Sequence, residues 1–168
     1  TIGGGAAGVA GYARERLFGP LGMRSAVIEF DQSETPMGAA FILATPRDWA
    51  RFGLLYLNDG LAGGRRLLPE GWVAEASRPT PGAAPGYGAG FWTNLGESPG
   101  AQRRRSWGAP EESFFANGNF GQTVLIIPSE RMIVARFGFS QDGGPLNLER
   151  TLALTARVIA HLHEGEGD

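Results

Sequence analysis

Apolar residues near the start of the chain recur at the spacing of a helix. Within residues 7–18, Val9, Tyr12 and Leu17 fall on this pattern. Gly19 and Pro20 follow directly, and this pair is expected to end the helix because proline cannot continue the backbone ladder.

A second helix is predicted to begin after Thr45, whose hydroxyl can cap the helix, with Pro46 at its first position. Asp48 then lies near the positive end of the helix dipole. Three aromatic residues at i, i+3 and i+7 form one buried stripe on this helix: Trp49, Phe52 and Tyr56. Residues 58–60 (NDG) end it in a turn, and residues 69–73 (PEGWV) open a third, shorter helix.

After residue 86 the pattern becomes that of strands, in four segments: residues 87–93, 113–116, 122–127 and 131–137. The last two are joined by Pro128-Ser129-Glu130, which indicates a hairpin. The segment 123–127 (TVLII) is apolar at almost every position. We therefore expect it inside a sheet that is covered on both faces.

The end of the chain predicts an amphipathic helix over residues 146–163 that packs on the sheet through one face: Leu148, Leu152, Thr155, Ile159 and Leu162. Residues 96–113 are polar and rich in arginine, and we expect a surface excursion there. The whole chain predicts an α+β fold in one domain, an antiparallel sheet covered by helices. Residues 1–80 would form a mainly helical part, and residues 87–137 the sheet.

Composition limits the chemistry more than it limits the fold. All 15 basic residues other than histidine are arginine, so no lysine is available as a general base or Schiff-base former within these 168 residues. The chain has no cysteine, which excludes disulfides and thiolate chemistry. A net charge of −2 argues against nucleic acid and anionic membranes as partners, and no apolar stretch approaches the ~20 residues of a membrane span. Because the chain begins at Thr1 without a leader, we expect an excerpt of a longer protein.

Several familiar motifs find little support. Gly3, Gly5 and Gly8 match G-x-G-x-x-G, but only two residues precede them, so the required strand is missing and loop glycines are favoured. The only histidines, 161 and 163, are two apart on a helix and point to different faces, which argues against a shared metal. The run 103–105 (RRR) is interpreted as a solvated loop rather than a phosphate patch. No G-x-S-x-G elbow occurs, and the neighbouring carboxylates at 111 and 112 do not suit a glycosidase pair.

Four ordered segments carry a resemblance: YARERLFGPLGM at 12–23, ATPRDWARFGLLYL at 44–57, LLPEGWV at 67–73, and FANGNFGQ at 115–122 with IPS at 127–129. Residues 87–94 (YGAGFWTN) fit the same pattern. Together they resemble the C-terminal portion of the penicillin-recognising serine hydrolases. The most similar branch is that of class C β-lactamases, esterases and 6-aminohexanoate-oligomer hydrolases. The resemblance implies a β-lactamase/transpeptidase-like fold that is incomplete at its N-terminal side.

The resemblance implies an acyl-enzyme mechanism on an ester or amide without a cofactor. The family uses a serine in S-x-x-K, a tyrosine in Y-x-N or S-D-N, and a Lys-Thr-Gly strand triplet. S-x-x-K is impossible in a chain without lysine, and the resemblance places the first two motifs upstream. The missing N-terminal half is therefore the expected partner. Ala116, Asn117 and Gly118 align with the triplet, and the N–H of Asn119 is expected to serve the oxyanion hole.

Other features of this segment bear on the substrate. Gly118 would let a substrate approach the backbone closely, and Phe120 is the aromatic residue expected to line an apolar acyl pocket. Alanine at 116 cannot hold a substrate carboxylate as the family's lysine does, which argues against efficient penicillin hydrolysis. Two interpretations stay open: part of a serine hydrolase, or a non-catalytic binding or structural module that retains the scaffold.

Overall fold

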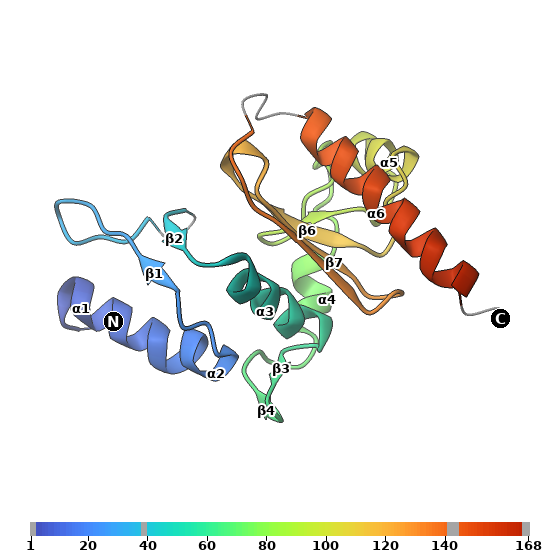
Figure 1. The fold of residues 1–168 in the computed structure, drawn as a ribbon. Helices are drawn as coiled ribbons and strands as arrows, with labels where there is room; N and C mark the ends of the chain where they lie inside the picture. The colour runs from blue at the N-terminus through green and yellow to red at the C-terminus, as the bar shows by residue number, and fades with distance from the viewer. Residues whose placement is uncertain (1–2, 38–39, 141–144, 166–168) are drawn as a thin grey trace.

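The computed structural model describes residues 3–37, 40–140 and 145–165, and it is an α+β fold (Figure 1). Its helical segments, in chain order, are α1 (Gly5–Ala13), the π-helix η1 (Arg14–Phe18), α2 (Gly19–Leu21), α3 (Pro46–Leu57), α4 (Trp72–Ser77), α5 (Pro99–Ser106), the 3₁₀ turn η2 (Asn119–Gly121) and α6 (Pro145–Gly165). Its strands are β1 (Val27–Ile28), β2 (Ile42–Leu43), β3 (Leu61–Ala62), β4 (Arg65–Arg66), β5 (Trp92–Thr93), β6 (Phe114–Asn117), β7 (Thr123–Ile127) and β8 (Met132–Arg136).

The main sheet is antiparallel with the strand order β5-β6-β7-β8. All five residues of β7 are buried, which confirms the prediction of a strand covered on both faces. Val124 and Ile126 pack on the side of α3, whereas Leu125 and Ile127 pack on the side of α6. Figure 1 shows the sheet between these two helices. The β7–β8 hairpin is also confirmed, with Ile127 opposite Met132.

Helix α3 begins as the sequence predicts and packs closely on the sheet. The Thr45 hydroxyl accepts from the Asp48 N–H at 3.4 Å, and Pro46 occupies the first turn. The aromatic stripe lies against the sheet, where the Phe52 and Tyr56 rings are 5.1 Å apart between centroids. A Cβ at Gly53 would lie 2.9 Å from Ile133 Cγ2, so the absence of a side chain there permits the close approach of helix and sheet.

The first helix does not end where the sequence indicates. Instead of stopping at Gly19-Pro20, it continues to Leu21, and Gly22 then ends it in a left-handed conformation. The π-turn of η1 explains this, because the Gly19 N–H donates to Arg14 O, five residues back. A Cβ at Gly19 would lie only 2.7 Å from that carbonyl oxygen, so glycine fits the wider turn. Gly5 and Gly8 lie within α1 rather than in a loop, and no described strand precedes them.

A small cluster joins this first part of the chain to α3. Phe18, Leu21 and Met23 pack with Leu55 of α3. Beside them, the buried carboxylate of Asp48 accepts from the Ser25 N–H at 2.8 Å and from the Ser25 hydroxyl at 2.6 Å. These hydrogen bonds, followed by the Arg51 guanidinium, hold the pKa of Asp48 below its usual value. Asp48 is therefore both a helix residue and the polar link to the preceding segment.

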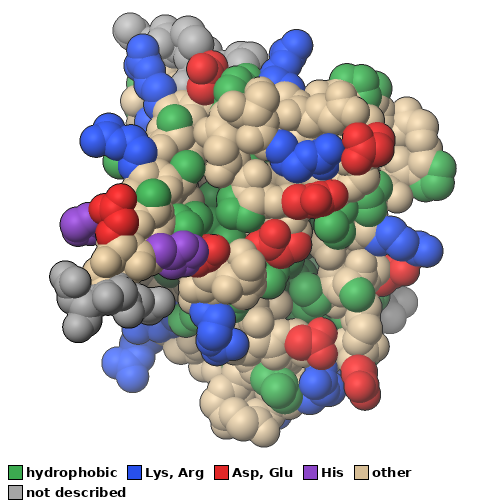
Figure 2. All heavy atoms as spheres, turned by 90° about the vertical axis from the view of Figure 1, so that its right-hand side faces the viewer, with side chains coloured by type: hydrophobic (Ala, Val, Ile, Leu, Met, Phe, Trp, Pro, Cys, Tyr) green, Lys and Arg blue, Asp and Glu red, His purple; other side chains and the backbone are tan. Residues whose placement is uncertain are grey.

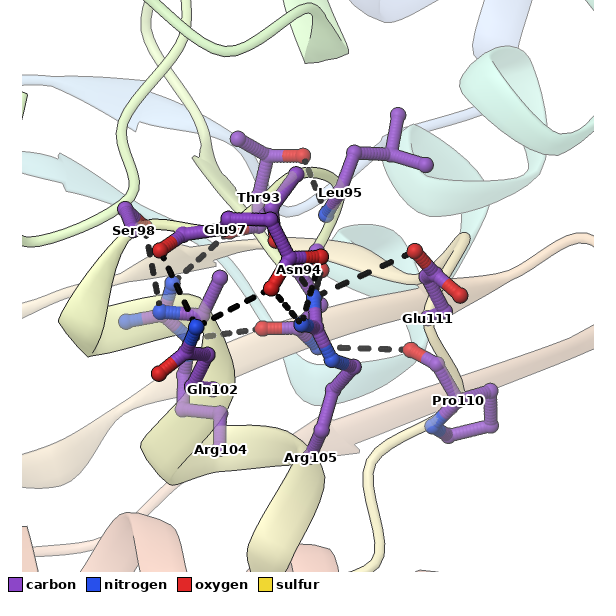
Figure 3. A network of polar contacts seen from close by, with 12 residues as sticks. Thr93, Asn94, Leu95, Glu97, Ser98, Gln102, Arg104, Arg105, Pro110 and Glu111 are labelled. Carbon is purple, nitrogen blue, oxygen red and sulfur yellow. Dashed lines mark hydrogen bonds and ion pairs between the residues drawn. The ribbon is translucent and has the colours of Figure 1, made fainter.

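The prediction of a surface excursion over residues 96–113 is wrong. Most of its first half forms α5, and Arg104 on that helix is buried (Figure 3). The Arg104 guanidinium donates to Asn94 Oδ1 at 2.6 Å and, at 2.7–3.2 Å, to three backbone carbonyls: those of Pro85, Gly86 and Thr93. Burial lowers the pKa of Arg104 to about 10. Sequence reasoning missed this residue because an arginine run has the same composition whether its members are solvated or buried.

The C-terminal helix packs on the sheet much as predicted. Leu152 and Thr155 are buried, and Leu148 and Ile159 pack against the same cluster, whereas Leu162 is 51% exposed. Seen from the right-hand side of Figure 1, the surface carries basic, acidic and apolar side chains interspersed (Figure 2). None of the helices in the described part of the chain combines the length and apolar character needed to cross a bilayer.

Candidate active site

The predicted triplet lies at the end of β6, where one side of the strand has no neighbour among the described residues. On the β5 side, pairing reaches only Trp92 opposite Phe115. On the β7 side it continues through Asn117 opposite Thr123, and the Gly118 N–H donates to Gln122 O at 2.7 Å. The last residues of β6 therefore present a free strand edge, which can pair with an extended ligand.

The N–H of Asn119 belongs to this free edge. Gly118 is extended, with φ −99° and ψ 178°, so consecutive N–H groups point in opposite directions. Because the Gly118 N–H points toward β7, the Asn119 N–H points away from it. Within residues 3–37, 40–140 and 145–165 this N–H has no acceptor, and the Asn119 side chain instead accepts from the Phe120 N–H at 3.1 Å. A rigid, unpaired donor of this kind can stabilise a developing oxyanion.

The three residues of the triplet have different surroundings. Ala116 is half-buried and packs with the cluster under α3. Asn117 is exposed, and its Oδ1 accepts from the Thr123 hydroxyl at 2.9 Å, which ties the end of β6 to β7. Gly118 is exposed, and a Cβ there would come no closer than 3.6 Å to its nearest neighbour, Gln122. The open backbone at Gly118 therefore leaves room for a bound group rather than for a packed protein side chain.

Phe120 follows on the turn to β7 and has an unusual conformation. Its φ of 57° is in the left-handed region, which residues with a side chain rarely adopt. The ring is 39% exposed and packs against Phe139, with 4.4 Å between ring centroids. Sequence reasoning did not identify Phe139, because this residue lies after β8, 19 positions away in the chain. Two other aromatic side chains near the triplet, Trp92 and Phe115, stack on each other in the cluster under α6.

Arg136 connects the two segments that carry these rings. Its guanidinium donates to Gly121 O at 2.7 Å and to the Ser140 hydroxyl at 2.6 Å. One side chain from β8 thus links the turn after β6 to the segment after β8. Because Arg136 is opposite Thr123 in the sheet register, the link starts from a fixed position.

One sequence of the form Y-x-N occurs in the chain, at Tyr56-Leu57-Asn58, although the resemblance places the family's tyrosine motif upstream. The Tyr56 ring packs against Phe52 and Phe91, with centroids 5.1 and 4.6 Å away. Burial raises the pKa of its hydroxyl above the ordinary value. A tyrosine in this setting stabilises the core rather than removing a proton from a nucleophile.

Other candidate groups do not form a second site. His163 Nε2 lies 2.8 Å from Glu130 Oε2, and His161 is near Glu164 instead. Within the described residues, no cluster of three or more histidine, aspartate or glutamate side chains could hold a metal ion. Two hollows in the surface lie beside the β3–β4 hairpin and beside α4, and neither includes the end of β6. The candidate site is thus an open strand edge.

Comparisons with known proteins bear on the family and the fold of the chain. The sequence profile of the family described as Beta-lactamase matches residues 2–158. A Bacillus anthracis structure assigned as a 6-aminohexanoate-dimer hydrolase is similar, with a TM-score of 0.66 and 26% identity over 91% of this chain and 38% of that chain. A Bacteroides dorei DSM 17855 structure assigned as a beta-lactamase has a TM-score of 0.56 and 19% identity, over 84% of this chain and 49% of that one.

Comparison with curated proteins gave no match. The chain spans less than half the length of each of the two similar structures. The family match covers nearly all of the 168 residues, and the sheet and the helices on its two faces agree with it. The chain therefore belongs to the beta-lactamase family.

Proposed function

We propose that this chain supplies the oxyanion-hole strand of a serine hydrolase that cleaves a small ester or amide through an acyl-enzyme. The observation that carries the proposal is the free edge of β6, where the Asn119 N–H points away from β7 and has no acceptor in the described part of the chain. A substrate carbonyl oxygen placed at this N–H becomes an oxyanion when a nucleophile attacks the carbonyl carbon. The fixed dipole then stabilises the transition state more than the ground state.

We further propose that the nucleophilic serine and its lysine come from a segment outside these 168 residues, which would be the N-terminal part of the same domain. The absence of lysine supports this, because S-x-x-K cannot be formed from this sequence. The open strand edge supports it as well, since a hydrolase site also needs walls that exclude water.

The surface of the first part of the chain also supports a further segment. Helix α1 has no buried residue. On the β1–β2 hairpin, Val27 and Leu43 are directly opposite each other, and their exposed fractions are 55% and 54%. Phe41, next to β2, is 52% exposed. Apolar side chains gathered in this way are typical of a surface that another segment covers.

The second candidate, a non-catalytic module with the same scaffold, is favoured by the missing lysine alone. The two candidates are separated by the intact mass of the natural gene product from its source cell, before and after treatment with a fluorophosphonate. A hydrolase gives a product well above 17.8 kDa that gains one adduct. A product of about 17.8 kDa without an adduct would favour the non-catalytic module.

The oxyanion role has its own test in the full-length product. Asn119→Pro removes the backbone N–H at the first position of a helical turn, where proline is tolerated. We expect kcat for ester hydrolysis to fall by about 10²–10³-fold. Asn119→Ala is the matched control, because it removes the same side chain but keeps the N–H, and it should retain kcat within a few-fold. Equal losses in both variants would contradict the role of the N–H.

A further inference from the structure

Two exposed phenylalanine side chains meet beside the candidate site. Phe120 comes from the turn after β6 and Phe139 from the segment after β8, and their ring planes are tilted by 34° at a centroid distance of 4.4 Å. Phe139 is 71% exposed, more than any other large apolar residue in the described part of the chain. Two aromatic rings that remain in water do not gain the free energy of burial. An apolar ligand group that covered this pair would therefore bind favourably.

The backbone keeps the pair in place at an energetic cost. Phe120 adopts φ 57° and ψ 26°, a left-handed conformation that is unfavourable for a residue with a side chain. Residues held in such conformations gather at ligand sites, where the surrounding structure maintains them. Here Arg136 provides that support, since it binds Gly121 O and the Ser140 hydroxyl, one residue beyond each phenylalanine.

The charges around the pair favour an uncharged ligand group. Ala116, Asn117 and Gly118 carry no charge, and Asn119 and Phe120 extend that neutral segment into the turn. The charged side chain that contacts this turn is Arg136, and its guanidinium is engaged by Gly121 O and Ser140. A carboxylate on the ligand would therefore find no unengaged cation on the described part of the turn.

We propose that Phe120 and Phe139 together bind the apolar acyl chain of the substrate, so that the enzyme prefers medium-length, uncharged acyl groups over acetyl. Phe120 directly follows the residue whose N–H would bind the carbonyl oxygen, and the acyl chain is attached to that same carbonyl carbon. The proposal rests on the proposed function and adds to it the class of acyl group and a residue, Phe139.

The test compares p-nitrophenyl octanoate with p-nitrophenyl acetate in the full-length product. In Phe139→Ala the ratio of kcat/KM for p-nitrophenyl octanoate to that for p-nitrophenyl acetate should fall about tenfold, because only the octanoyl chain is long enough to contact the ring. Phe139→Leu keeps an apolar side chain and should restore most of the ratio. The matched control is Leu154→Ala, since Leu154 is a 60% exposed apolar residue on α6, and it should leave the ratio unchanged.

An unchanged ratio in Phe139→Ala, or an equal change in Leu154→Ala, would overturn the proposal. A loss of kcat/KM that depends on the alcohol part of the ester rather than on its acyl chain would also overturn the proposal. Calorimetric binding of octanamide against acetamide, both uncharged, separates this inference from the proposed function. A full-length protein without hydrolysis or fluorophosphonate adduct that still binds octanamide through Phe139 contradicts only the proposed function, whereas equal octanamide binding in wild type and Phe139→Ala contradicts the acyl site.

Discussion

The first part of the chain, residues 3–37 and 40–44, and the sheet with its two covering layers differ in how completely they bury their apolar residues. Strand β7 has all five residues buried, whereas α1 has none. In Figure 1, the sheet lies between α3 and α6, while α1 and the β1–β2 hairpin lie on the far side of α3. The sheet is thus covered by this chain itself, and the first part is covered on one side only. The difference fits the proposal that another segment covers the exposed apolar face of the first part.

The largest effect is expected inside the sheet. Leu125→Ala removes a fully buried side chain between β6, β8 and α6, and it should lower the free energy of unfolding by about 2–5 kcal/mol. Leu43→Ala makes the same change on the half-exposed hairpin, and we expect less than about 0.5 kcal/mol there. Urea unfolding of both variants measures the contrast. Equal losses would show that the first part is as tightly packed as the sheet.

The second effect concerns Arg104, whose hydrogen bonds join α5 to the segment that contains β5. Arg104→Lys keeps the charge but cannot reach Asn94 and three carbonyls at once, so we expect a loss of roughly 2–3 kcal/mol. Arg103→Lys, at the exposed neighbouring position, should change stability by less than about 0.5 kcal/mol. Thermal unfolding of both variants measures the difference. If Arg104→Lys were as stable as wild type, the hydrogen bonds of Arg104 would contribute little to stability.

A smaller effect is expected at the link between the two regions. Asp48→Asn weakens the hydrogen bonds from Ser25, which should cost about 1–2 kcal/mol at neutral pH. The folded-state pKa of Asp48 is lowered, so its stabilisation is present above its unfolded pKa of 3.8 and is lost as the pH falls through the lower folded value. In Asp48→Asn, the free energy of unfolding should therefore decrease less steeply with falling pH below about pH 4 than it does in wild type. Urea unfolding midpoints between pH 2 and 7 measure this pH dependence, and Glu70→Gln, at an exposed position, is the control. If the midpoint of Asp48→Asn depended on pH as steeply as that of wild type, the role of Asp48 would be contradicted.

The smallest effect on stability is expected on the exposed face of the hairpin. The double variant Val27→Ser, Leu43→Ser should change the free energy of unfolding by less than about 0.5 kcal/mol, because both side chains are already half in water. Its effect should appear in association instead. Sedimentation of the isolated chain should show less self-association than wild type, and a monodisperse wild-type monomer would count against an interface on this face.

The sequence predicted best those elements whose pattern is local. The cap at Thr45, the aromatic stripe of α3 and the apolar run of β7 each follow from neighbouring residues, and each is confirmed. The end of the first helix was predicted wrongly, because the π-turn that accommodates Gly19 and Pro20 depends on backbone geometry that propensity does not record. The role of Arg104 was missed for a related reason, since its acceptors come from residues 85–94.

The same division applies to the candidate site. By itself, the sequence determined that no lysine is present and that a strand ends near Ala116, because these are properties of composition and of consecutive residues, whereas the family resemblance assigned the triplet to Ala116, Asn117 and Gly118. Only the tertiary structure decided that β5 stops opposite Phe115, which leaves the edge beyond it free. Only the tertiary structure brought Phe139 to Phe120, through a sheet register and an arginine from β8. Contacts between distant segments depend on how strands pair and turns close, and a linear pattern of polar and apolar residues does not contain that information.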